Sequence, residues 1–107
     1  MVDRADIKSS FSSSVNSRAD ELERISRDIL GHPESGYREV RTSNLVADWF
    51  KTNGLEIQIC IAKTGVIATL DTGIPGPHIA VMGELDSLIV PGHAHADPET
   101  GAAHACG

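Results

Sequence analysis

The fold is decided by the stretch Leu55-Glu-Ile-Gln-Ile-Cys-Ile-Ala-Lys-Thr-Gly-Val-Ile-Ala-Thr-Leu70. Its first half has apolar residues at every second position, namely Leu55, Ile57, Ile59 and Ile61, separated by Glu56, Gln58 and Cys60. A period of two is typical of a strand with one buried face. The run from Val66 to Leu70 predicts a second strand. The centre of the chain is therefore expected to form a sheet.

One long helix is predicted before these strands. From about Asp3 to Leu30, apolar residues recur at spacings of three and four, as on one stripe of a helix; they are Ile7, Phe11, Val15, Ala19, Leu22, Ile25 and Ile29. Six serines between Ser9 and Ser17 lower the helix propensity of its first half. Gly31 followed by Pro33 predicts its end.

A second helix is predicted roughly from Glu39 to Asn53, with Gly54 as its stop. Its expected buried face comprises Leu45, Val46, Trp49 and Phe50. Farther along, the continuous apolar run Ile79–Met82 predicts a central strand covered on both faces. The order is helix, helix, strand, strand, strand, followed by a loop rich in Pro and Gly. This order predicts an α/β fold in which two helices precede the strands of a mixed sheet.

The composition excludes several classes of protein. The chain has 107 residues, 40% hydrophobic and 22% charged, as in ordinary soluble globular proteins. Its net charge of −6 argues against a nucleic-acid partner, because phosphate binding needs clustered Lys and Arg. No apolar run approaches the ~20 residues of a membrane span. Without a secretory signal or a disulfide framework, a cytoplasmic, reduced protein is expected.

Two carboxylates follow the predicted central strand. Glu84 and Asp86 come directly after Met82 and Gly83, and ligands commonly bind beyond the carboxyl ends of strands in open α/β sheets. One residue separates the two acids, so in an extended segment they point in opposite directions and only one need face a site. The alternative is that both are solvated acids of a loop.

The end of the sequence, His104-Ala105-Cys106-Gly107, contains a thiol and an imidazole among small residues. These are ligand types that divalent transition metals select, and a bound metal would deprotonate the thiol. The alternative is that Cys106 is a small core residue, as lone cysteines usually are. Cys60, in the middle of a predicted strand, is interpreted as structural.

The remaining histidines give weaker patterns. His93 and His95 have the spacing of a His-x-His ligand pair, but in a loop containing Pro and Gly solvated side chains are the favoured interpretation. His32 is assigned to the turn between the two helices. His78 has no partner that the sequence identifies.

Four segments resemble, in order, the metal-dependent aminoacylase/carboxypeptidase amidohydrolases, which hydrolyse N-acyl amino acids, indole-acetyl amino acids and aminobenzoyl-glutamate. These four matching segments are His32–Glu39, Thr64–Ala68, Gly83–Leu88 and Thr100–Gly107. The Gly-Glu-Leu-Asp form is most similar to the aminobenzoyl-glutamate hydrolase branch. The resemblance implies that residues 1–107 are the opening, N-terminal part of a zinc-peptidase-like catalytic domain, with the lid domain and the rest of the catalytic domain absent.

The resemblance also implies site residues. Cys106 corresponds to a metal ligand, whose partner in the family is a His directly after the Gly. Asp86 corresponds to an acidic position beside the metal, where it would orient a ligand. One or two divalent ions, zinc or manganese, would polarise the amide carbonyl and activate a water, with a Glu as general base. The family's base and further ligands match no position of this chain, and substrate-binding residues are not identified.

The function expected from this resemblance is that of a metal-dependent amidohydrolase or peptidase. Its N-terminal segment, inactive in isolation, would contribute to hydrolysis of N-acyl amino acids or related small amides by metal-activated water. The alternative is a non-catalytic truncated remnant or small binding module; a redox or structural-zinc domain is a weaker third, because no Cys-x-x-Cys pair is present. The expected partner is a small amide, without nucleic acid or membrane, and the full-length protein could form a homo-oligomer.

Overall fold

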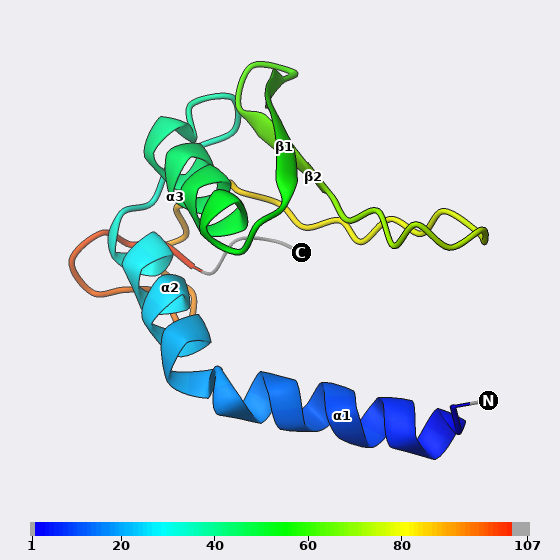
Figure 1. The fold of residues 1–107 in the computed structure, drawn as a ribbon. Helices are drawn as coiled ribbons and strands as arrows, with labels where there is room; N and C mark the ends of the chain where they lie inside the picture. Colours follow the sequence, from blue (N-terminus) through cyan, green and yellow to red (C-terminus); the bar gives the residue numbers. More distant parts are fainter. Residues whose placement is uncertain (1, 104–107) are drawn as a thin grey trace.

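In the computed structural model, which describes residues 2–103, three helices precede a two-stranded sheet. The helices are α1 (Arg4–Ser17), α2 (Ala19–Gly31) and α3 (Val40–Thr52), and the strands are β1 (Glu56–Ile61) and β2 (Gly65–Thr69). Figure 1 shows α3 beside the hairpin of β1 and β2, whereas α1 projects away from them. The α/β class is therefore confirmed. None of the described helices is long and apolar enough to cross a membrane.

The long helix expected from Asp3 to Leu30 is instead two helices that meet at Arg18. The backbone of Arg18 has φ −108° and ψ 10°, outside the helical region. Serines favour such interruptions because their hydroxyls bond nearby backbone groups, and the Ser17 hydroxyl donates to the Ser14 carbonyl at 2.8 Å. No residue of α1 is buried, whereas Ile25 and Ile29 of α2 are half-buried. The apolar stripe therefore packs only in its second half.

Helix α3 confirms the prediction of a helix from Glu39 to Asn53. It ends at Thr52, two residues before Gly54, whose φ of +76° is the left-handed conformation that glycine adopts readily after a helix. Its expected inner face is half-buried at Leu45, Val46, Trp49 and Phe50. The indole N–H of Trp49 donates to the Glu21 carboxylate at 2.8 Å, which connects α3 to α2.

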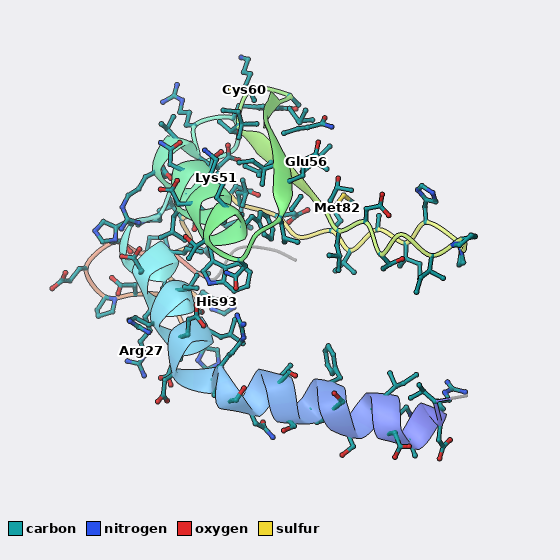
Figure 2. The ribbon with its side chains drawn as sticks, viewed as in Figure 1. Arg27, Lys51, Glu56, Cys60, Met82 and His93 are labelled. Atoms are coloured by element: carbon teal, nitrogen blue, oxygen red, sulfur yellow. The ribbon has the colours of Figure 1, made fainter. Side chains whose placement is uncertain are left out.

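The hairpin confirms both strands expected between residues 55 and 70. β1 and β2 are antiparallel, with Ile57 opposite Ala68 and Ile61 opposite Gly65. Between these pairs the register shifts, so that two residues of β1 stand opposite one of β2, which is a β-bulge. Cys60 lies in this bulge with a φ of +60° and is exposed near the turn (Figure 2). Its interpretation as a packed structural residue is therefore wrong.

The prediction of a central strand at Ile79–Met82 is also wrong. Ile79, Val81 and Met82 are 84%, 98% and 94% exposed. An inner strand needs neighbours that satisfy its backbone N–H and C=O groups, and the sheet of the described residues consists of β1 and β2. Residues 70–82 instead form a projecting arm that leaves the hairpin and folds back towards it (Figure 1).

Polar residues dominate the buried positions. Among residues 2–103, the buried hydrophobic side chains are Ala47 and Ala102, while Glu39, Thr42 and Ser87 are buried polar ones. The radius of gyration is 16.4 Å, against about 13 Å for a compact domain of this length. With so small an apolar core, hydrogen bonds between segments are expected to carry much of the order in this structure.

Gly65 provides a test of the hairpin. A Cβ at Gly65 would lie 2.6 Å from the carbonyl oxygen of Ile61, a backbone atom that cannot move away freely. We expect Gly65→Ala to lower the free energy of unfolding by about 1–3 kcal/mol, as overpacking does. Urea unfolding followed by circular dichroism measures this. Gly76→Ala in the arm is the control, because no atom lies within 4 Å of its Cβ position; equal midpoints for the two variants would contradict the expectation.

Candidate functional site

The first matching segment, His32–Glu39, joins α2 to α3. His32 ends α2, and its Nδ1 lies 2.9 Å from the carbonyl oxygen of Asp28, which confirms its assignment to the turn between helices. The Asp28 carboxylate accepts two hydrogen bonds from Arg41, both 2.8 Å long. Tyr37 has a φ of +63°, an uncommon conformation for a non-glycine residue. The Asp28–Arg41 hydrogen bonds therefore join the end of α2 to the start of α3.

The carboxylate of Glu34 binds the first turn of α3. One oxygen accepts hydrogen bonds from the backbone N–H of Thr42 at 2.6 Å and from its hydroxyl at 2.8 Å. The other accepts from the backbone N–H of Arg41 at 3.0 Å. The first N–H groups of a helix have no partner within the helix and favour a negative charge. Glu34 therefore caps α3, a task that its N-cap residue Glu39 does not perform through its side chain.

The pKa of Glu34 reflects this contact. Desolvation by burial acts to raise the pKa, but the backbone N–H groups of Thr42 and Arg41, the Thr42 hydroxyl and the Arg41 charge together outweigh it. The pKa of Glu34 consequently lies below the ordinary glutamate value. The carboxylate is thus ionised at neutral pH, and its charge is favourable at the start of a helix.

The backbone of Glu34 binds the third matching segment, Gly83–Leu88. The carbonyl oxygen of Glu34 accepts a hydrogen bond from the N–H of Ser87 at 2.8 Å. Ser87 is 4% exposed, and the neighbouring Asp86 is half-buried. Glu84 is exposed and borders a hollow of about 320 Å³ against α2. Of the two candidate acids, Asp86 is thus the one held close to the body of the structure.

Glu39 connects the first matching segment to the second, Thr64–Ala68. Its carboxylate is buried and accepts a hydrogen bond from the Thr64 hydroxyl at 2.6 Å. This bond is the largest influence on the pKa of Glu39 and lowers it, against the opposing effect of desolvation. Glu34 and Glu39 therefore connect the same loop to different parts of the structure.

The fourth matching segment lies alongside the third. Ile89 and Ala102 form an antiparallel bridge, and the N–H of Ala103 donates to the carbonyl of Leu88 at 3.0 Å. Asp97 shapes the intervening loop, since its carboxylate accepts from the N–H groups of Thr100 and Glu99, each at 2.9 Å. These bonds, Thr100 first, hold the pKa of Asp97 below its ordinary value. The described part of this segment, residues 100–103, therefore runs next to the loop that carries Asp86.

The predicted metal ligand Cys106, together with His104, lies outside the described residues. His93 and His95 are exposed with ring centres 5.8 Å apart, and the N–H of His95 donates to Nδ1 of His93. His78 is also exposed. Across residues 2–103, no three His, Cys, Asp or Glu side chains come together as a metal site would require. The described donor set therefore does not hold a metal ion by itself.

Sequence reasoning missed the roles of Glu34 and Glu39. Both were part of the first matching segment but had no function assigned to them. For Glu34 the available signal was its position, since acidic residues are favourable near the start of a helix. The contacts of Glu34 with Ser87 and of Glu39 with Thr64 join residues far apart in sequence and gave no local signal.

Comparison with known proteins finds relatives along most of the chain. The chain is 34% identical over 91 residues to the IAA-amino acid hydrolase ILR1-like 2 of Arabidopsis thaliana, and the match covers 82% of this chain and 20% of that protein. It is 34% identical over 85 residues to the N-acetylcysteine deacetylase of Bacillus subtilis, covering 76% and 22%. Over 68 residues it is 37% identical to the hippurate hydrolase of Campylobacter jejuni, covering 64% and 18%.

These matches are partial. The chain spans about a fifth of the length of the curated relatives it matches. No family model matches the chain, and no solved structure does.

The contact between Glu39 and Thr64 can be tested by removing the hydroxyl. We expect Thr64→Val to lower the free energy of unfolding at pH 7 by about 1–3 kcal/mol, because a buried carboxylate loses a partner. The folded pKa of Glu39 is lowered, so the stabilisation is present above the ordinary pKa of 4.5 and is lost as pH falls through the folded value. The difference between wild type and variant should therefore shrink below pH 4.5.

Urea unfolding at pH 7 and at successively lower pH measures this difference. Thr69→Val is the matched control, because Thr69 is an exposed residue of the same hairpin. A pH-independent difference for Thr64→Val, or an equal effect of Thr69→Val, would contradict the assigned contact.

Proposed function

We propose, on the premise that this chain belongs to the amidohydrolase family, that the protein hydrolyses the amide bond of an N-acyl amino acid or a related small amide. The names of the relatives support this substrate class, since an IAA-amino acid, N-acetylcysteine and hippurate each carry an acyl group on an amino-acid nitrogen. The proposed partner is accordingly a small molecule, and the proposed location is the cytoplasm.

The observation that carries the proposal is the convergence of the four matching segments. Glu34 connects the first to the third, Glu39 connects the first to the second, and Ala103 connects the fourth to the third. The contact between these segments supports a shared site at the loop that carries Asp86.

We further propose that residues 1–107 form the opening part of a catalytic domain that uses a divalent ion, zinc or manganese. In this proposal Cys106 is a metal ligand, and Asp86 orients another ligand through a hydrogen bond. The described residues alone do not supply enough ligands, so the proposal assigns the others to positions outside residues 2–103. Such an ion, once bound, supplies a Lewis acid for the amide carbonyl.

The first test is hydrolysis of hippurate, N-acetylcysteine and an IAA-amino acid, with added zinc or manganese. We expect turnover by the complete protein that contains this chain and none by the 107 residues alone, because the general base and further metal ligands that the resemblance implies match no position of this chain. Release of the free amino acid measures the rate. Turnover by the 107 residues alone would contradict the assignment of ligands. Absence of turnover by the complete protein would favour a non-catalytic remnant or binding module.

The second test compares the two cysteines in the complete protein. We expect Cys106→Ala to lower bound metal and turnover together, because one bond to the ion is lost. Cys60→Ala should leave both unchanged and alter stability by less than about 0.5 kcal/mol, since Cys60 is exposed. Metal analysis and the hydrolysis assay measure the outcome; full metal occupancy and rate in Cys106→Ala would refute the proposed ligand.

A further inference from the structure

Glu34 contacts two separate parts of the structure, one through its side chain and one through its backbone. Its carboxylate accepts three hydrogen bonds from Arg41 and Thr42 at the start of α3. Its carbonyl oxygen accepts the hydrogen bond of Ser87 at 2.8 Å. We propose that Glu34 is a positioning residue. Its side chain holds its backbone against α3, and that backbone in turn holds the loop that carries Asp86.

Leu85, just before Asp86, borders the hollow against α2, and the backbone hydrogen bonds that hold this loop in the described residues come after Asp86. After Asp86, the N–H of Ser87 binds Glu34 and the carbonyl of Leu88 binds the N–H of Ala103. Before Asp86, the chain comes from the exposed arm of residues 70–82. The position of Asp86 therefore depends on the anchors that follow it, and the bond between Glu34 and Ser87 is the nearer of the two.

The side chain of Glu34 is the part of this arrangement that a mutation can change. Thr42 is 1% exposed, so a substitution that withdraws an acceptor leaves its buried donors without a partner. The loop would then shift or open to satisfy them, and the carbonyl of Glu34 would move with it. Ser87 is 4% exposed, and its N–H would lose its partner in a place that water reaches poorly.

The competing explanation is that Glu34 only caps α3. A cap stabilises the helix it binds and has no specific effect on a distant loop. Glu39 offers the matched comparison, because it belongs to the same loop, is buried, and its carboxylate binds Thr64 rather than the N–H groups at the start of α3. If Glu34 positions the loop, a substitution of Glu34 should raise the amide exchange rate of Ser87 much more than a substitution of Glu39 does.

Amide hydrogen exchange at Ser87 in the full chain tests the inference. We expect Glu34→Gln to raise the exchange rate of Ser87 about tenfold, and Glu39→Gln to raise it less than about twofold. A milder variant, Thr42→Val, removes one donor from the Glu34 carboxylate and should raise the rate about threefold without unfolding the chain. An unchanged Ser87 rate in Thr42→Val and Glu34→Gln, or equal rates in Glu34→Gln and Glu39→Gln, would overturn the proposal.

The consequence for catalysis rests on the proposed function and needs a separate measurement. In the complete protein, we expect Glu34→Gln to lower kcat about tenfold while KM changes less than about twofold, because displacement of Asp86 would disturb the reacting centre rather than the binding of substrate. An unchanged kcat in a folded Glu34→Gln enzyme would overturn the catalytic part. A wild-type protein without turnover contradicts the proposed function alone, and the exchange rates of Ser87 then still decide the positioning role.

Discussion

The rest of the described structure depends on the contact between the ionised carboxylate of Glu34 and the N-terminus of α3. The first turn of a helix presents N–H groups without partners and a partial positive charge. Glu34 satisfies three donors there, and this fixes a loop whose backbone holds Ser87. The order of the loop that carries Asp86 therefore follows from an electrostatic contact made by a residue six positions before the first residue of α3.

Hydrogen bonds determine much of the order in this structure because the apolar core is small. Two alanines are the buried hydrophobic residues of the described chain, and burial of so little apolar surface contributes little stability. Hydrogen bonds to charged groups are stronger than those between neutral groups, and they specify geometry as well as adding stability. The contacts of Glu34 with Thr42 and of Glu39 with Thr64 accordingly define where the helices, hairpin and loops meet.

The candidate site could be predicted in part. The resemblance to the family indicated Asp86, which the structure places half-buried beside Ser87, while Glu84 is exposed. The roles of Asp86 and Cys106 stay predictions. The functions of Glu34 and Glu39 could not be inferred, because each depends on a partner that is distant in sequence or on the exact start of α3.

The sequence by itself determined the elements whose signals are local. Periodicity and stop residues gave α3, β1 and β2 nearly to the residue, and four short segments gave the family. Tertiary structure decided the rest. Ile79–Met82 has the composition of an inner strand but no paired neighbour, so it is exposed in an arm, and the helix expected over residues 3–30 is interrupted at Arg18. Local patterns state what a segment prefers, whereas pairing, capping and burial depend on partners that only the folded chain brings within reach.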